Sequence, residues 1–142
     1  MLLSAEVDKD MVPNHGATAL HLAADLGHVD VVHLLLSAGV DKDKVTNDGA
    51  TALHMAAFNG NLQVVPLLLE AGVDTDTGTS KDGSTAFHCA AEHGYLEIVR
   101  LLKESGAGKD EVTSNGETAL HLAVKNGHLE VVHLLLHVEI GS

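Results

Sequence analysis

The chain repeats itself four times. A block of the form Gly-x-Thr-Ala-Leu/Phe-His begins at Gly16, Gly49, Gly83 and Gly116, so successive copies start 33, 34 and 33 residues apart. Each block continues into a mostly Ala-rich run, a glycine and a second apolar run such as residues 31–36. This order of runs and glycines predicts that one unit consists of two short helices and a loop.

Side chains at fixed positions of the unit predict where its helices begin and end. Glycines such as Gly27 follow the first apolar run, as left-handed residues at helix ends do. The second run carries an apolar stripe that one unit alone cannot bury, so we expect neighbouring units to stack. A threonine precedes each first run, where its hydroxyl can cap the helix: Thr18, Thr51, Thr85 and Thr118.

Composition supports packed short helices and excludes several classes of function. The 142 residues are 45% apolar but only 2% aromatic, which makes an all-β fold unlikely. A formal net charge of −12 disfavours nucleic acid and anionic membranes as partners. A single cysteine, Cys89, excludes an internal disulfide and a zinc site built from several thiolates. We expect a cytoplasmic protein, with the nucleus as a second compartment, and no secretion because no signal peptide pattern is present.

The repeat resembles the ankyrin repeats. The resemblance rests on residues 48–57, Asp-Gly-Ala-Thr-Ala-Leu-His-Met-Ala-Ala, followed by Gly60 and Leu67 to Leu69, against the family pattern Gly-x-Thr-Pro-Leu-His-x-Ala-Ala. It implies an all-α repeat solenoid, in which helix-turn-helix units are joined by hairpin-like loops. We expect a single ankyrin-repeat domain over residues 1–142, with a partial repeat at 1–12 and repeats at about 13–45, 46–79, 80–112 and 113–142.

Three features depart from the family pattern. Alanine replaces the family's proline after the threonine in all four copies. Pro66 stands inside the second apolar run of its repeat, so we expect a kink or a shortened first turn there. The spacing of 34 residues places one extra residue in the loop at 74–82, and we expect it near Gly78.

The ends of the repeat array carry no polar cap. The last apolar run, residues 129–136, is as apolar as an internal one, although terminal repeats normally present a polar outer face. The chain also begins in the middle of a repeat. These features favour a segment of a longer array, an engineered or library-derived binder, or a protein that covers its ends by self-association.

Eleven histidines raise the question of metal binding or catalysis. His133 and His137 are four apart, but no carboxylate at matched spacing completes a metal site, so a surface pair is favoured. Cys89 falls in a core-facing register, where a thiol is inert. We therefore predict no enzyme activity, no cofactor and no metal. For the four histidines of the repeated block, the resemblance implies hydrogen bonds to the backbone of neighbouring loops: His21, His54, His88 and His121.

The resemblance implies that partners bind the concave face, formed by loop tips and first helices. Leu26 and Phe58 are expected there either as apolar anchors for a partner or as side chains that pack against a neighbouring repeat. We assign Tyr95 to packing at the helix junction. The positions transferred by register are Asn14, His15, Ala17, Asp25, Leu26, Asn47, Asp48, Ala50, Phe58, Asn59, Lys81, Asp82, Ser84, Glu92, His93, Ser114, Asn115, Glu117, Lys125 and Asn126.

The sequence therefore predicts a non-enzymatic module that binds another protein. The transferred positions carry an excess of negative charge, which favours a basic or polar partner. Two alternatives remain open. The first is a structural spacer within a longer ankyrin array, without a target of its own. The second is an element that responds to pH or metal through its histidines.

Overall fold

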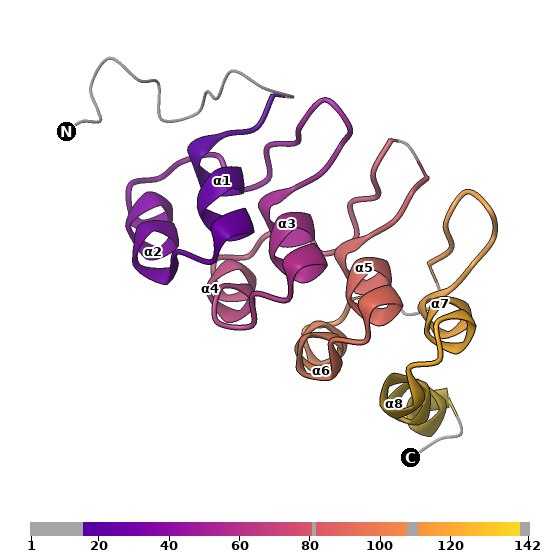
Figure 1. The fold of residues 1–142 in the computed structure, drawn as a ribbon. Coiled ribbons are helices and arrows are strands. Elements are labelled where there is room, and N and C mark those ends of the chain that lie inside the picture. The colour runs from indigo at the N-terminus through magenta and orange to yellow at the C-terminus, as the bar shows by residue number, and fades with distance from the viewer. Residues whose placement is uncertain (1–15, 81, 108–110, 140–142) are drawn as a thin grey trace.

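The computed structural model describes residues 16–80, 82–107 and 111–139, with side chains up to residue 136 (Figure 1). All regular secondary structure in these ranges is helical, which confirms the predicted all-α repeat solenoid. The helices form four pairs: α1 (Ala19–Leu26) with α2 (Val29–Ser37), α3 (Ala52–Asn59) with α4 (Val65–Glu70), α5 (Ala86–His93) with α6 (Leu96–Glu104), and α7 (Ala119–Lys125) with α8 (Leu129–Glu139).

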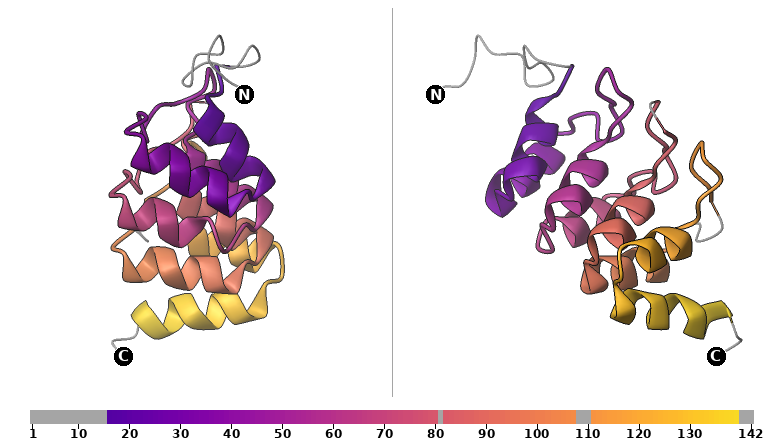
Figure 2. Two further views of the ribbon diagram at one scale, coloured as in Figure 1. Left: turned by 90° about the vertical axis from the view of Figure 1, so that its left-hand side faces the viewer. Right: turned by 45° about the vertical axis from the view of Figure 1, so that its right-hand side comes forward.

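The four pairs stack in chain order. The first helices α1, α3, α5 and α7 form one row, and the second helices form a row beside it (Figure 1). The loops between pairs project from the stack as fingers that lie side by side in the right-hand view of Figure 2. Each repeat therefore contacts its neighbours along the stack, as in other solenoids.

Every first helix begins with the same hydrogen-bonded cap. The Thr51 hydroxyl accepts a bond from the backbone N–H of His54, and the His54 ring nitrogen Nδ1 accepts from the backbone N–H of Thr51 at 2.9 Å. The same reciprocal box occurs at the other three first helices, so the predicted threonine caps are confirmed. Left-handed glycines end α1, α3 and α5, whereas α7 ends at Asn126, one residue before its glycine.

The helix that contains Pro66 is shorter than its equivalents. Helix α4 begins at Val65, whereas the register of the other second helices would start it at Leu62. Pro66 consequently lies in the first turn, where its missing N–H breaks no internal hydrogen bond. The expected shortened first turn is confirmed.

The extra residue of the long repeat lies at the tip of its finger. Two fingers close with a backbone bond from a glycine to the threonine three residues earlier, as Gly49 N–H does to Thr46. In the remaining finger the same bond joins Gly83 to Thr79, four residues earlier. The extra residue therefore lies in the predicted loop at 74–82, but between Thr79 and Gly83 and so a few residues after Gly78, because the register is kept through Thr79 and lost after it.

One continuous apolar core runs through the stack between the two rows of helices. Small side chains on the first helices, such as Ala56 and Ala90, are fully buried and let adjacent helices approach closely. Larger side chains such as Phe87 and Leu68 fill the remaining space. This rigid core fixes the relative positions of the fingers and of the last turns of the first helices.

Candidate functional site

The residues predicted to bind a partner lie on the last turns of the first helices and on the fingers. Asn14, His15 and Lys81 fall outside the described residues. Eleven of the others are exposed: Leu26, Asn47, Asp48, Phe58, Asn59, Asp82, Glu92, Ser114, Asn115, Lys125 and Asn126. The remaining six are half-buried: Ala17, Asp25, Ala50, Ser84, His93 and Glu117.

Two large apolar side chains are exposed on adjacent repeats. Leu26 on α1 is 58% exposed and Phe58 on α3 is 54% exposed. The Phe58 ring and the ring of His93 on α5 meet edge to face, with 4.7 Å between the centroids and an interplanar angle of 71°. His93 in turn stacks on Tyr95 at 5.6 Å. These contacts order Phe58 across the boundary between repeats while more than half of its surface faces solvent.

Tyr95 belongs to the helix junction, as predicted. Its ring covers Gly60, where an added Cβ would lie 2.9 Å from the ring carbon Cζ. The side chain is half-buried and packs against the core. Sequence reasoning missed that Tyr95 also supports His93, and through it Phe58.

Polar bonds between neighbouring repeats hold the same region in place. The side-chain amide of Asn59 donates to a carboxylate oxygen of Asp25. The amide of Asn61 donates to the backbone carbonyls of Ala24 and Asp25, at 2.6 and 3.0 Å. The expected binding residues Asp25 and Asn59 are thus partners of each other across the boundary between the first two repeats.

The fingers are joined to one another through their backbones. The Ser80 N–H donates to the Asp48 carbonyl at 2.8 Å, and the Ser114 N–H donates to the Asp82 carbonyl at 2.7 Å. The Asp82 carboxylate also accepts from the Thr79 hydroxyl at 2.7 Å. The backbones of Asp48 and Asp82 are consequently held at fixed positions on neighbouring tips, and the bond from Thr79 also holds the Asp82 carboxylate.

An ion pair lies on the last repeat. The Lys125 ammonium donates to the Glu117 carboxylate at 2.9 Å, and this bond raises the pKa of the fully exposed lysine. Exposed pairs of this kind contribute little to stability.

Three of the four repeated histidines reach the next repeat. The Nε2 atoms of His21, His54 and His88 lie 2.9, 2.7 and 2.9 Å from backbone carbonyls of the following finger. His121 has its cap partner Thr118 but, within the described ranges, no carbonyl at Nε2, and its ring is exposed. The expectation therefore holds for three histidines, whereas for His121 the described part of the chain supplies no following finger.

Burial shifts the pKa values of His21, His54 and Cys89. Desolvation lowers the pKa of His21 and of His54, although the bonds to neighbouring carbonyls oppose the shift. Desolvation raises the pKa of Cys89 from 9.0 to about 12, and nearby Glu92 and Asp82 act in the same direction. The thiol is therefore protonated at neutral pH, which makes it a poor nucleophile.

Neither a metal cluster nor a membrane-spanning helix is found in the described parts of the chain. No group of three His, Cys, Asp or Glu side chains there could hold a metal ion. His133 is exposed, and the side chain of His137 lies outside the description. No described helix is long and apolar enough to cross a membrane.

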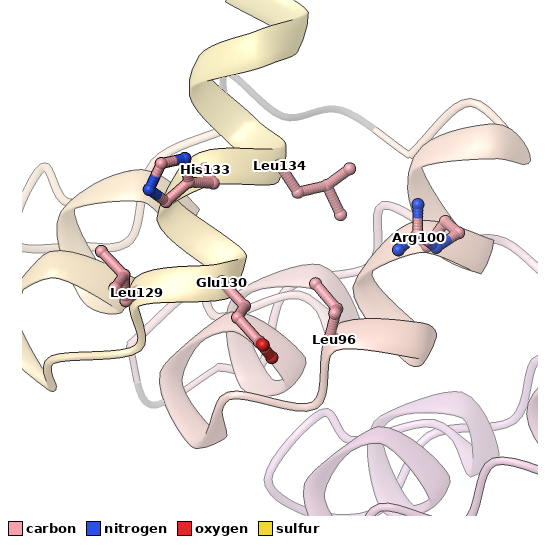
Figure 3. A pocket seen from close by; sticks show the side chains of 6 residues that line it. All are labelled: Leu96, Arg100, Leu129, Glu130, His133 and Leu134. Carbon is pink, nitrogen blue, oxygen red and sulfur yellow. The ribbon is translucent and has the colours of Figure 1, made fainter.

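A shallow pocket that sequence reasoning missed lies between the second helices α6 and α8 (Figure 3). It has a volume of about 420 Å³ and leucine side chains from both helices face it. The residues that line it are Leu96, Arg100, Leu129, Glu130, His133 and Leu134. It belongs to the row of second helices, whereas the predicted partner-binding residues belong to the first helices and fingers.

Comparison with known proteins identifies one matching family. The family described as ankyrin repeats (3 copies) matches residues 1–79 and again residues 71–142. None of the curated proteins matches the chain.

Proposed function

Since the chain belongs to the ankyrin-repeat family, whose repeats generally mediate protein–protein interaction, we propose that it binds a partner protein through a concave face. This face consists of the last turns of the first helices and the finger tips. The partner carries an apolar group flanked by basic or polar groups.

The observation that carries the proposal is the pair of exposed apolar side chains on neighbouring repeats. Leu26 and Phe58 occupy the last turns of α1 and α3. Burying a fully exposed side chain of this size contributes roughly 1.5–3 kcal/mol, and just over half of that surface is still available to a partner at Leu26 and Phe58. Because His93 already restricts the Phe58 ring, less conformational entropy is lost when a partner covers it.

The charges around these anchors support a basic or polar partner. Asp48 and Glu92 are exposed acidic residues of the proposed face. Asp25 is held by Asn59, so its carboxylate has a fixed position beside Leu26. Complementary charge on a partner accelerates encounter and fixes its orientation more than it increases affinity.

The test compares partner capture by the native chain with capture by an anchor variant, Leu26→Asp/Phe58→Asp. The matched control, Val45→Asp/Val112→Asp, replaces two exposed valines outside the predicted binding positions with the same residue. Circular dichroism checks that both variants keep the helical fold. Pull-down and mass spectrometry then identify proteins retained by each.

A partner retained by the native chain and the control but lost by the anchor variant supports the proposal. A partner retained equally by the anchor variant contradicts it. If none of the three retains a specific protein, the spacer interpretation becomes the better one.

A further inference from the structure

The last described repeat exposes positions that every earlier repeat buries. Val124 on α7 is 59% exposed, whereas Ala24, Ala57 and Ala91 at the same register are fully buried. We define the C-terminal face by four exposed residues of α7 and α8: His121, Val124, Leu129 and Leu136. The equivalents of His121 and Val124 are buried in every earlier repeat, whereas those of Leu129 and Leu136 are half-buried there.

The first described repeat exposes positions that, in later repeats, are covered by the preceding repeat. Val31 on α2 is 44% exposed, whereas its equivalents Val64 and Ile98 are fully buried. Leu22 is exposed, but its equivalent Leu122 is buried. The N-terminal face is defined by four residues of this repeat: Leu22, His28, Val31 and Leu34.

The polar groups of the internal interfaces are also left open at the two ends. The Nε2 atom of His54 meets a carbonyl of the next repeat, whereas within the described ranges Nε2 of His121 meets none. At Gly94 an added Cβ would strike the ring of His128, but at Gly127 nothing lies within 4 Å. The residue equivalent to His128 in the first repeat is the exposed His28.

We propose that the C-terminal face of one copy binds the N-terminal face of a second copy, so that two stacks join head to tail. Three internal boundaries show what covers each of these faces, namely the opposite face of another repeat of the same kind. Each chain carries one N-terminal face and one C-terminal face. The contact is heterologous, so it leaves one face of each kind open and permits longer rows of copies.

The geometry also assigns individual contacts across the new boundary. His21 Nε2 bonds to the carbonyl of Ala50, the residue after the first glycine of the next repeat. Ala17 holds the same place in the first repeat, so the carbonyl of Ala17 in the second copy would meet His121 of the first copy. The His28 ring of the second copy would cover Gly127, as the His128 ring covers Gly94. The apolar pair Leu22 and Val31 would pack against α7 and α8.

Net charge opposes this association and predicts its salt dependence. Each copy carries a formal charge of −12, so two copies repel one another at low ionic strength. Salt screens this repulsion over a Debye length of about 8 Å at 0.15 M, while burial of the apolar faces is unaffected. We expect the association to strengthen as salt is raised from 0.02 to about 0.5 M.

The test measures the mass of the 142-residue chain by sedimentation equilibrium over a range of concentrations. An N-face variant, Val31→Asp/Leu34→Asp, and a C-face variant, Val124→Asp/Leu129→Asp, each alter one face. Val45→Asp changes an exposed valine of an internal finger and serves as the control. Circular dichroism checks that each variant is folded.

The native chain and the control should show mass that rises with concentration, and each face variant alone should associate at least tenfold more weakly. An equimolar mixture of the two face variants should regain association but stop at a one-to-one dimer, because one intact face of each kind remains. A native chain that stays monomeric at 0.5 M salt and millimolar concentration would overturn the proposal. So would a face variant that associates like the native chain, since a head-to-tail contact needs both faces.

Discussion

The Nε2 atom of His54 lies 2.7 Å from the backbone carbonyl of Ser84, thirty residues further along the chain. The other ring nitrogen of His54 accepts the N–H of Thr51 and caps the helix that carries the histidine. One side chain therefore begins a helix and ties it to the next finger. The two roles become separable because His121 has the cap bond but no neighbour-repeat bond among the described residues.

Replacing His54 should destabilise the protein more than replacing His121. His54→Ala removes the cap contact and the bond to the Ser84 carbonyl, which then keeps only the Thr79 N–H as donor, while His121→Ala removes the cap contact alone. A buried hydrogen bond contributes about 1 kcal/mol net, so the free energies of unfolding should differ by at least ~1 kcal/mol. Urea unfolding of both variants measures the difference. Equal losses would mean that the inter-repeat bond contributes nothing.

A Cβ at Gly49 should cost more than a Cβ at Gly39. Both glycines have φ +81°, a left-handed conformation that costs an L-residue roughly 1–2 kcal/mol. At Gly49 the added atom would also lie 2.8 Å from the backbone nitrogen of Ser80, whereas at Gly39 nothing lies within 4 Å.

We therefore expect Gly49→Ala to lower the free energy of unfolding by about 1 kcal/mol more than Gly39→Ala, because the neighbouring finger must shift. Thermal and urea unfolding of the two variants give the comparison. If Gly39→Ala lowers the free energy of unfolding equally, the contact between the fingers does not add to the cost of a side chain at Gly49.

The Cys89 thiol should react slowly while the protein is folded. Its pKa of about 12 leaves roughly a thousandth of the thiolate present at pH 8 in a thiol of pKa 9.0. Alkylation by iodoacetamide at pH 8 should therefore be at least about 100-fold slower in the native protein than in urea. The native rate should still increase with pH at pH 10. A native rate within tenfold of the unfolded rate would show that the thiol is accessible and ionised.

Local features of the fold were predictable from the sequence, and contacts between repeats were less so. The cap at Thr51 depends on a residue three positions away, so a short pattern contains all of its determinants. The effect of Pro66 follows in the same way from its missing N–H. The extra finger residue was placed in the correct loop but a few residues too early, because the bond between Thr79 and Gly83 sets the register and the spacing of the repeats does not reveal it.

The candidate site shows the same division between local and long-range information. The repeat register identified Leu26 and Phe58 as outward positions, and both are exposed. The contact between Phe58 and His93 depends on how closely α3 and α5 approach, which no local pattern contains. Exposure at the two ends of the stack depends likewise on which repeats have a neighbour.

Acid should destabilise the protein through its buried histidines His21 and His54. Burial lowers the pKa of His21 and of His54 in the folded state below the ordinary value of 6.5. Between that lowered pKa and about 6.5, the unfolded chain binds protons that the folded chain does not bind. Stability consequently increases with pH across this window. The contribution of the two neutral rings to the free energy of unfolding is fully present above pH 7.5. It decreases as the pH drops below 6.5 and stops decreasing below the folded-state pKa.

The measurement compares urea midpoints at pH 7.5 and 5.5 for the native chain and for His21→Gln/His54→Gln. The double variant is less stable at pH 7.5 because its caps are altered, but it should lose less stability between the two pH values. His133→Gln, which changes an exposed ring on α8, should retain the native loss. Carboxylate titration is common to all three proteins and cancels in the comparison. An identical midpoint shift in the double variant would show that acid acts elsewhere, because only proton uptake by these two rings distinguishes it from the native chain.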